Sequence, residues 1–260
     1  MKAGSRLDER VVADGLAETR SKAEGMIRAG QILVDDAPID KPGTRVRPEA
    51  VVRLRAGIRR FVSRGGEKLV GALEDLGVPV AGRHCLDVGA STGGFTECLL
   101  LAGAPSVVAV DVGYGQLHPK LRNDPRVTVL ERTNVRQLEP EALAREGKQP
   151  IDLVTLDVSF ISARIVIPVL ARLLPGAELL VLVKPQFEVG RGRVGKGGVV
   201  RDDDVRRQVV DRVRETAARL GYECRGEAPS RLAGPKGNRE VFLWLSPQIT
   251  DNKGETGRSS

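Results

Sequence analysis

Four charged residues occupy positions that a parallel sheet would bring to one edge. Asp157 ends the apolar run DLVTLD, Lys184 ends LLVLVK, and Glu240 opens REVFLWL. Ligands collect at the carboxyl ends of parallel strands, and an antiparallel final strand would begin at that same edge. Lys68, on the helix predicted before the first strand, can complete the set. We expect these four side chains to form one catalytic group, with structural ion pairs as the alternative.

A group of two lysines and two carboxylates suits the activation of a hydroxyl. An attacking hydroxyl must lose its proton while its new bond forms. Lys184 can act as the general base if its pKa is lowered, which partial burial and a neighbouring Lys68 would do. A charged Lys184 that orients the oxygen lone pair is equally compatible with the sequence. Asp157 and Glu240 favour the ammonium form, so we expect them to orient Lys184 and the hydroxyl.

A second candidate site is the glycine-rich turn in CLDVGASTGGF, which leads from an apolar strand into a helix. Backbone N–H groups at such a turn bind ligands. The dinucleotide pattern G-x-G-x-x-G is absent, and the acid-x-Gly-x-x-x-Gly pattern from Asp87 resembles the first motif of S-adenosylmethionine-dependent methyltransferases. Asp111 ends the next strand, where a carboxylate accepts both ribose hydroxyls of a nucleoside. The pattern favours S-adenosylmethionine; a nicotinamide nucleotide and a sheet without ligand are the alternatives.

A second glycine-rich segment, GRGRVGK, satisfies only part of a phosphate-binding pattern. Gly197 follows Lys196 where a nucleotide triphosphatase needs Ser or Thr to hold magnesium. The segment also does not lie directly between a strand and a helix. We expect a basic loop that closes over RNA near the catalytic edge, or a plain loop.

The first sixty residues are predicted to form a separate basic unit. They carry 13 basic and nine acidic side chains, a net charge of +4, which is more than half of the net charge of +7 of the whole chain. Phe61 is the first aromatic residue, so this unit would bind RNA through phosphate charge and backbone shape and not through stacking. Apolar spacing predicts two helices, the second starting with a Ser21–Glu24 capping box. Short strands with alternating arginines follow, so that one sheet face is apolar and the other basic.

The order RLDERVVADGLAETRSKAEGMIRAGQILVDDAPID closely resembles the S-four RNA-binding domain, over about residues 5–55. The resemblance implies that four basic side chains face structured RNA: Arg6, Arg20, Lys22 and Arg28. An ordinary pair of charged helices is the alternative.

Six further blocks extend the resemblance to about residues 5–247: SRGGEKL, DVGASTGGFT, DVGYGQL, DVSFIS, VKPQFEVG and GNREVFLWL. Behind an S-four domain they resemble the TlyA (haemolysin A-like) family of ribosomal RNA 2′-O-methyltransferases, whose FtsJ-like domain has a K-D-K-E tetrad. The resemblance implies S-adenosylmethionine as cofactor and ribosomal RNA as partner. It implies a cofactor site made of Asp87, Gly89, Ala90, Ser91, Gly93, Phe95, Asp111 and Asn134. Phe95 replaces a tryptophan of the wider FtsJ pattern, and Asn134 replaces the acid that meets the adenine.

The predicted fold class is α/β, a Rossmann-like doubly wound sheet behind a small α+β RNA-binding domain. The predicted boundaries are 1–58, a linker at 59–66, 67–247 for the catalytic domain, and a disordered tail at 248–260. Three scattered cysteines and two histidines provide neither a disulfide framework nor a zinc site. No apolar run approaches the length of a membrane helix or a secretory signal, so we expect a cytoplasmic protein. A non-catalytic ribosome-assembly factor is the rival function.

Overall fold

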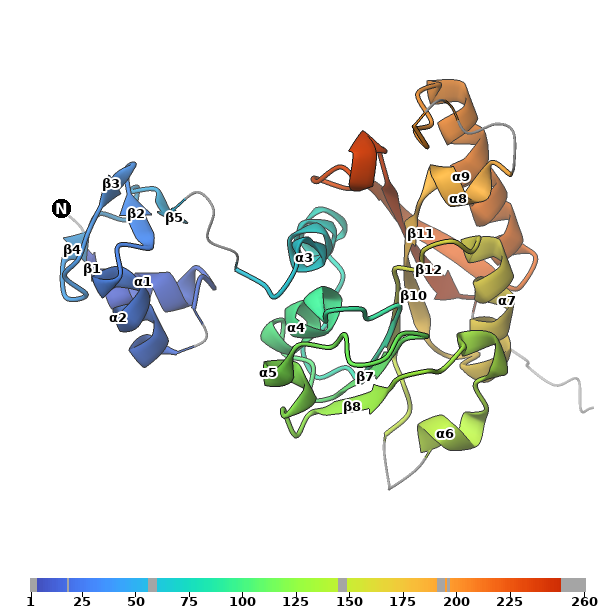
Figure 1. Ribbon diagram of the computed structural model, residues 1–260, viewed down its shortest axis with the longest axis horizontal. Coiled ribbons are helices and arrows are strands. Elements are labelled where there is room, and N and C mark those ends of the chain that lie inside the picture. Colours follow the sequence, from blue (N-terminus) through green and yellow to red (C-terminus); the bar gives the residue numbers. More distant parts are fainter. Residues whose placement is uncertain are drawn as a thin grey trace, which may run out of the picture.

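The computed structural model describes residues 4–17, 19–55, 60–144, 149–190, 195 and 197–248. Within these ranges a small domain of short helices and strands precedes a larger α/β domain (Figure 1). The predicted fold class is therefore confirmed. Among the described helices, none is long and apolar enough to cross a membrane.

The N-terminal domain packs two helices against two small sheets. Their apolar faces form one buried cluster that includes Leu7, Val11, Ile27 and Ile32. The two sheets differ from the single sheet predicted, because a strand that the sequence did not indicate, at Ser5–Arg6, pairs with Arg45–Val46. The elements are β1 (Ser5–Arg6), α1 (Leu7–Ala13), α2 (Arg20–Arg28), β2 (Ile32–Val34), β3 (Ala37–Pro38), β4 (Arg45–Val46) and β5 (Val52–Leu54).

The predicted start of the second helix is wrong by two residues. Thr19 is the N-cap of α2, and its hydroxyl accepts a hydrogen bond from the backbone N–H of Lys22 at 3.2 Å. Ser21 lies inside the helix. Either hydroxyl can cap a helix, so the sequence pattern alone does not distinguish them.

The larger domain contains a seven-stranded sheet in the order β11-β12-β10-β9-β6-β7-β8. Five neighbouring strands are parallel, and β12 runs antiparallel to β10, as predicted for the final strand. The strands are β6 (Cys85–Val88), β7 (Val107–Val110), β8 (Val127–Leu130), β9 (Leu153–Leu156), β10 (Glu178–Val183), β11 (Tyr222–Pro229) and β12 (Val241–Pro247). The helices are α3 (Arg64–Leu76), α4 (Gly94–Leu101), α5 (Pro119–Arg122), α6 (Pro140–Ala144), α7 (Ala163–Leu173), α8 (Pro185–Glu188) and α9 (Asp203–Ala218), with 3-10 turns η1 (Val135–Gln137) and η2 (Pro235–Gly237).

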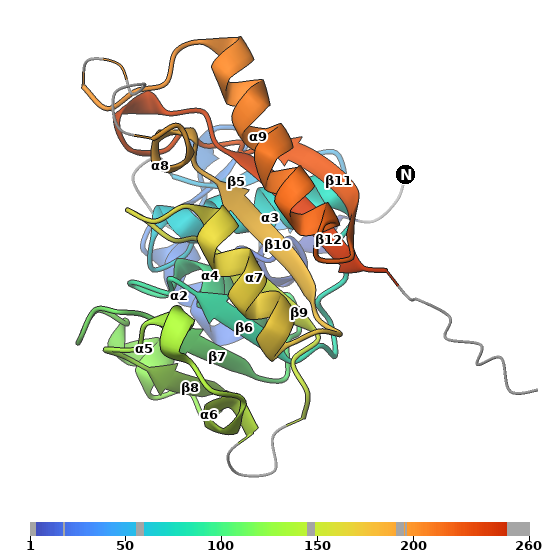
Figure 2. The same cartoon turned by 90° about the vertical axis from the view of Figure 1, so that its right-hand side faces the viewer.

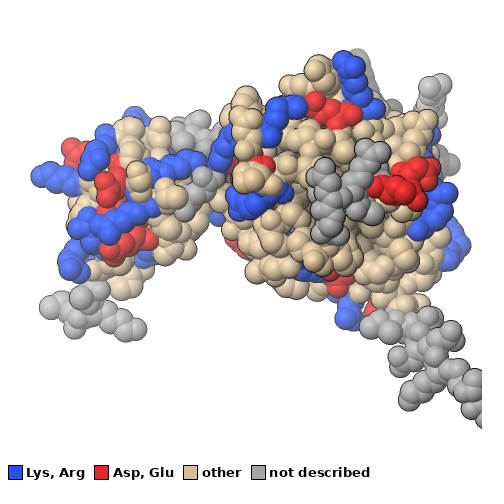
Figure 3. Space-filling view, turned by 90° about the horizontal axis from the view of Figure 1, so that it is seen from below, with Lys and Arg blue, Asp and Glu red and all other residues tan. Residues whose placement is uncertain are grey.

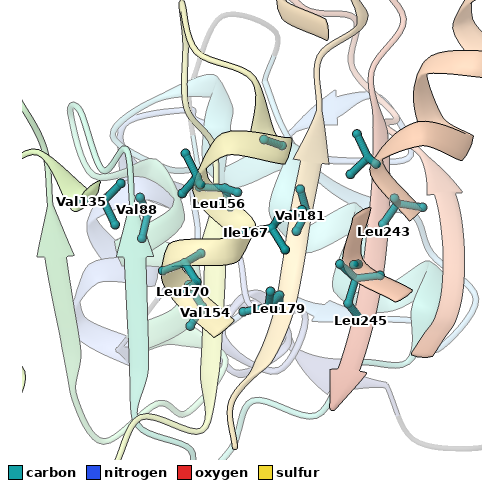
Figure 4. Packing of buried hydrophobic residues seen from close by; sticks show 14 of the residues in the cluster. Val88, Val135, Val154, Leu156, Ile167, Leu170, Leu179, Val181, Leu243 and Leu245 are labelled. Carbon is teal, nitrogen blue, oxygen red and sulfur yellow. The ribbon is translucent and has the colours of Figure 1, made fainter. Parts of the chain in front are cut away.

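Helices cover both faces of the sheet, which gives three layers. Figure 2 looks onto the face covered by α7 and α9, and α3 and α4 lie behind the sheet. On the α7 side, Val154, Leu156 and Val181 of the central strands pack against Ile167 and Leu170 (Figure 4). Leu180 and Leu182 of the same strand β10 point into the opposite cluster. A strand that is buried on both faces is a continuous apolar run, which is why the sequence predicts these strands.

The predicted boundary between the linker and the catalytic domain needs correction. Residues 59–66 were predicted as linker, but α3 already starts at Arg64, where Ser63 caps it. Phe61 is buried in the same cluster as Leu69, so residues 61–66 pack with the catalytic domain. We propose 61–247 as the extent of that domain. Residues 56–59, most of the predicted GRGRVGK loop and the tail beyond Gln248 lie outside the described residues.

Strand β11 was not predicted, although it pairs with β12 along its length. It lies at the edge of the sheet, and its exposed positions carry charged residues such as Glu223 and Glu227. Gly226 interrupts the pattern further, at a register shift. An edge strand with one solvent-exposed face has few apolar residues to mark it.

The Asp87 carboxyl joins three elements in the interior of the larger domain. It accepts hydrogen bonds from Thr96 of α4 at 2.6 Å and from Thr155 of β9 at 3.1 Å. The side chain is completely buried, and burial raises the pKa of this carboxyl to about 7 although both threonines oppose the shift. Its ionised form is therefore less stable in the folded protein than in the unfolded chain.

We predict that Asp87 makes stability depend on pH. Its folded-state pKa of about 7 lies above its ordinary value of 3.8, so this contribution to stability is present below that ordinary value and is lost as pH rises through 7. The neutral variant Asp87→Asn cannot lose a proton. Its melting temperature relative to the native protein should therefore be higher at about pH 8 than at about pH 5. Thermal unfolding measures this, with Asp211→Asn on the exposed side of α9 as control. The same difference at both pH values would contradict the prediction.

Candidate active site

Two cavities meet at the carboxyl edge of the parallel strands. The smaller, about 350 Å³, is lined by residues from the start of α3, the glycine-rich turn and the ends of β9 and β10. The larger, about 620 Å³, lies over β7 and extends to the residues after β8 and β9. Gly89, Ser91 and Asp157 line both. A ligand in one cavity can therefore contact a ligand in the other.

The predicted catalytic residues form two ion pairs at this edge. The Lys184 ammonium lies 2.6 Å from Asp157 Oδ1 and donates a hydrogen bond to Ser159 Oγ at 3.1 Å. Lys68 pairs with Glu240. Both lysines are at least nine-tenths buried, with exposed fractions of 7% for Lys68 and 9% for Lys184. Burying a charge is costly unless it is paired, so each carboxylate stabilises its own lysine.

Glu240 has a different partner from the one expected. We expected it to orient Lys184 and the hydroxyl, but it binds Lys68, and it lines neither of the two cavities. A Cβ atom at position 234 would collide with its carboxylate, so Gly234 leaves the space that this carboxylate occupies. Lys68, Asp157 and Lys184 line the smaller cavity. Glu240 therefore supports Lys68 from outside the cavity.

The glycine-rich turn is shaped by close backbone contacts. Gly89 has φ +87°, and a Cβ there would lie 2.5 Å from the backbone oxygen of Asp157. Asp111 holds the turn from the other side, because its carboxylate accepts hydrogen bonds from the N–H groups of Ser91 at 2.8 Å and Gly113 at 2.7 Å. A carboxylate has about four acceptor positions. Asp111 therefore retains acceptor capacity toward the larger cavity, which it lines.

The predicted cofactor residues divide into three groups. Those that line the larger cavity are Gly89, Ser91, Asp111 and Asn134. Those that line only the smaller one are Ala90 and Phe95, and those that line neither are Asp87 and Gly93. Gly93 instead forms the left-handed N-cap of α4, and Asp87 lies beneath the turn. These two residues shape the site without facing it.

Asn134 presents different hydrogen-bonding groups to the site from those of the acid that it replaces in the wider pattern. Its side-chain oxygen caps η1 by accepting a hydrogen bond from the N–H of Arg136 at 3.1 Å. The amide nitrogen of the same side chain is a donor. Asn134 therefore presents a donor to the larger cavity where an acid would present acceptors.

Sequence reasoning missed two residues, of which the first lies at the rim of the larger cavity. Phe160 has φ +66° and an exposed fraction of 91%, and it lines the larger cavity. Its ring lies 5.2 Å from that of Phe187. A left-handed backbone at a bulky residue is rare and strained. A left-handed conformation has no sequence signal at a phenylalanine, so the resemblance of the block DVSFIS to the family pattern is the signal that could have singled out Phe160.

The second missed residue is Glu188, which joins the two catalytic loops. It lies at the end of α8, four residues after Lys184, and is 6% exposed. Its carboxylate accepts hydrogen bonds from Ser162 Oγ and from the backbone N–H of Ala163 at 2.6 Å. These two residues begin α7, in the loop that follows Asp157. Glu188 therefore fixes the loop of Lys184 against the loop of Asp157.

The candidate RNA-binding residues lie within a network of charges. Arg6 Nη2 lies 2.8 Å and Arg20 Nε 3.1 Å from the same Asp8 oxygen. Hydrogen bonds from Arg6 lower the pKa of this fully buried carboxyl to about 2. Arg28 lies 3.3 Å from Glu24. Figure 3 shows the resulting mixture of blue and red side chains on the smaller domain.

The exposure of the basic side chains on α2 agrees with the sequence-based expectation that they face solvent. The side chains of Arg20 and Arg28 are 52% and 66% exposed, and Lys22 is exposed as well, so all three reach solvent as predicted. Asp8 holds Arg6 and Arg20 together at one point. Their contact with RNA stays a prediction.

Comparison with known proteins assigns the chain to a family. A model described as FtsJ-like methyltransferase matches residues 61–246, and one described as S4 domain matches residues 5–52. The chain belongs to the FtsJ-like methyltransferase family. Both matches agree with the two domains of the structure, and the first begins at Phe61, inside the segment predicted as linker.

Relatives match over nearly the whole length. The Mycobacterium tuberculosis (strain ATCC 25618 / H37Rv) protein named 16S/23S rRNA (cytidine-2'-O)-methyltransferase TlyA is 52% identical over 246 residues, covering 94% of this chain and 90% of its own. Hemolysin A of Brachyspira hyodysenteriae is 39% identical, over 91% of this chain and 98% of its own. A solved Streptococcus thermophilus structure has a TM-score of 0.71 at 36% identity, with 96% and 90% of the two chains covered.

We predict that Asp111→Ala weakens binding of S-adenosylmethionine, the methyl donor that family membership implies, by about 1.5–3 kcal/mol. The variant removes acceptors toward the larger cavity and releases the N–H groups of Ser91 and Gly113. Asp111→Asn keeps one acceptor oxygen and should lose less. Calorimetric titration measures both. Unchanged affinity in Asp111→Ala would refute the assignment, and RNA affinity should stay constant as the control.

We predict that Glu188→Ala reduces turnover by about 10–100-fold, because small displacements of reacting groups have effects of this size. Its loss releases Ser162 and Ala163, and so the loop that carries Asp157. Glu188→Gln keeps an acceptor and should stay within a few-fold of the native rate. Single-turnover methyl transfer measures both variants, and thermal unfolding reports their stability. A Glu188→Ala protein that is folded and has the native rate would exclude a positioning role.

Proposed function

We propose that this protein is an S-adenosylmethionine-dependent methyltransferase that methylates a ribose 2′-OH of ribosomal RNA. Family membership supports methyl transfer, and the relative at 52% identity is named for rRNA cytidine-2'-O-methylation. The S4 match supports RNA as the partner of the N-terminal domain. One observation carries the proposal: the Lys184–Asp157 ion pair lies at the boundary between the two cavities.

The larger cavity fits a nucleoside-bearing cofactor. Gly89 lets the glycine-rich turn that lines the cavity approach the backbone of Asp157 closely, and Asp111 offers free acceptor positions for ribose hydroxyls. Asn134 offers an amide donor for a base edge, and Ser91 lies where the cavities join. When bound, S-adenosylmethionine supplies a methyl group on a positively charged sulfur. The assignment of these residues to cofactor binding is part of the proposal.

The smaller cavity would hold the acceptor ribose. Lys184 donates one hydrogen bond to Ser159 and forms an ion pair with Asp157. An ammonium has three N–H donors, so Lys184 retains donor capacity for the acceptor hydroxyl. A Lys184 held in this way would orient the oxygen lone pair, and the Asp157 carboxylate beside it can accept the hydroxyl proton. The geometry favours this positioning role over a neutral Lys184 that acts as general base.

Lys68 would act on the opposite side of the acceptor. Its ammonium lines the smaller cavity, and Glu240 holds it there. A second fixed cation stabilises negative charge as it develops on the attacking oxygen. The rival function, an RNA-binding factor without catalysis, would not require Lys68, Lys184 and Glu240 to be buried and all four charges to be paired.

The test is the loss of chemistry without loss of binding. Lys184→Ala should reduce single-turnover methyl transfer to rRNA by about 10²–10³-fold, which is the usual loss when one fixed donor at a reacting oxygen is removed, with the affinities for cofactor and RNA within a few-fold of native. Arg172→Ala, at an exposed arginine in the last turn of α7, is a control that should keep the native rate. If Lys184→Ala retains more than about a tenth of the rate, the proposed role is wrong.

A further inference from the structure

A third cavity with strongly positive walls lies beside the active site. It measures about 340 Å³ and lies between the segment that leads into α9 and the turn that precedes β12. Four basic residues line it, Arg201, Arg206, Lys236 and Arg239, against a single acid, Asp203. The catalytic machinery described above uses none of them.

The walls of this cavity are fixed by a buried amide. Asn238 is 2% exposed, and its side chain donates to the backbone oxygen of Gly198 at 2.9 Å and accepts from the N–H of Val200 at 3.0 Å. These bonds join the two segments that form the cavity. Lys236, in the turn that precedes β12, has a left-handed conformation with φ +63°. Strain of this kind at a non-glycine residue persists where the surrounding structure maintains it and is concentrated at binding sites.

Positive charge is in excess around the cavity. Arg206 is held in place by hydrogen bonds to the backbone oxygens of Val200 at 3.0 Å and Arg201 at 2.8 Å. Asp203 pairs with Arg206 and lies 4.0 Å from Arg239, so two cations share one carboxylate. Burial and then the neighbouring Arg239 lower the pKa of Arg206. Like charges held this close favour an anion between them.

The position of the cavity indicates which anion. The segment from Ala233 to Glu240 lines the smaller cavity at its first residue and supports Lys68 at its last. Lys236 and Arg239 lie on this same segment. A ribose in the smaller cavity carries a phosphate on each side, and the strand continues beyond both. One of these flanking phosphates would therefore lie toward the segment that carries Lys236 and Arg239.

We propose that the cavity of Arg201, Lys236 and Arg239 binds a backbone phosphate of the RNA strand that contains the acceptor ribose. The inference rests on the proposed function, because it requires RNA as substrate. It adds an anchor on the catalytic domain to the one expected on the S4 domain. Arginine and lysine are the usual phosphate ligands, and contacts of this type determine register and not sequence.

The experiment compares RNA binding and turnover in Arg201→Ala/Lys236→Gly with the native protein. Glycine suits the left-handed backbone at position 236, so the second change removes charge without adding strain. Each phosphate contact contributes about 0.7–0.9 to the slope of log affinity against log salt. We expect the slope to fall by about this amount, KM for rRNA to rise at least several-fold, and cofactor affinity to stay constant. Arg225→Ala, an exposed arginine of β11 paired with Glu223, is the control.

The outcomes separate this inference from the proposed function. A native protein that transfers no methyl group to any rRNA would overturn the function itself. If the native protein is active, an unchanged slope and KM in the double variant would overturn the phosphate site alone. Inorganic phosphate, titrated against chloride at equal ionic strength, distinguishes the two sources of phosphate. Saturable binding of inorganic phosphate that the variant abolishes, with RNA binding unaffected, would assign the cavity to free phosphate and contradict the proposal.

Discussion

The ion pair between Lys184 and Asp157 imposes the main constraint on this structure. The neighbouring parallel strands β9 and β10 end at one edge, and a charged residue follows each of them there. Lys184 is buried, and a buried charge is stable only if it is paired and hydrogen-bonded. The strands must therefore stay in register, and their loops must stay together. Glu188 and the Phe160–Phe187 contact serve the second requirement, since they join the loop after β9 to the helix after β10.

Buried carboxylates with different partners organise most of the functional edge. Glu240 stabilises Lys68, Asp157 stabilises Lys184, and Glu188 joins the loops. Asp87 connects β9 to α4 below the glycine-rich turn, in the more protonated state that its raised pKa indicates. Asp8 has the corresponding place in the N-terminal domain, where it gathers Arg6 and Arg20. In both domains, carboxylates therefore fix the positions of the neighbouring cations.

The sequence predicts the parts of this arrangement that follow from apolar periodicity. Central strands such as β9 and β10 are continuous apolar runs, and the charged residues that end them were found for that reason. Pairing between distant segments has no such signal. Glu240 was assigned to Lys184 and binds Lys68, because the choice depends on the position of α3 over the sheet. Glu188 was missed because its partners, Ser162 and Ala163, lie on a distant segment. Phe160 was missed because its left-handed backbone has no sequence signal. Edge strand β11 is buried on one face only, so its sequence has few apolar residues and resembles that of a loop.

The central claim is that the two cavities bring a methyl donor to a ribose hydroxyl. The most direct measurement is to incubate unmodified ribosomal RNA with the protein and S-adenosylmethionine that carries a labelled methyl group. Digestion of the RNA to nucleosides and mass spectrometry then identify the atom that carries the label. This account predicts a label on the ribose 2′-oxygen, and a label on a nucleobase would contradict it.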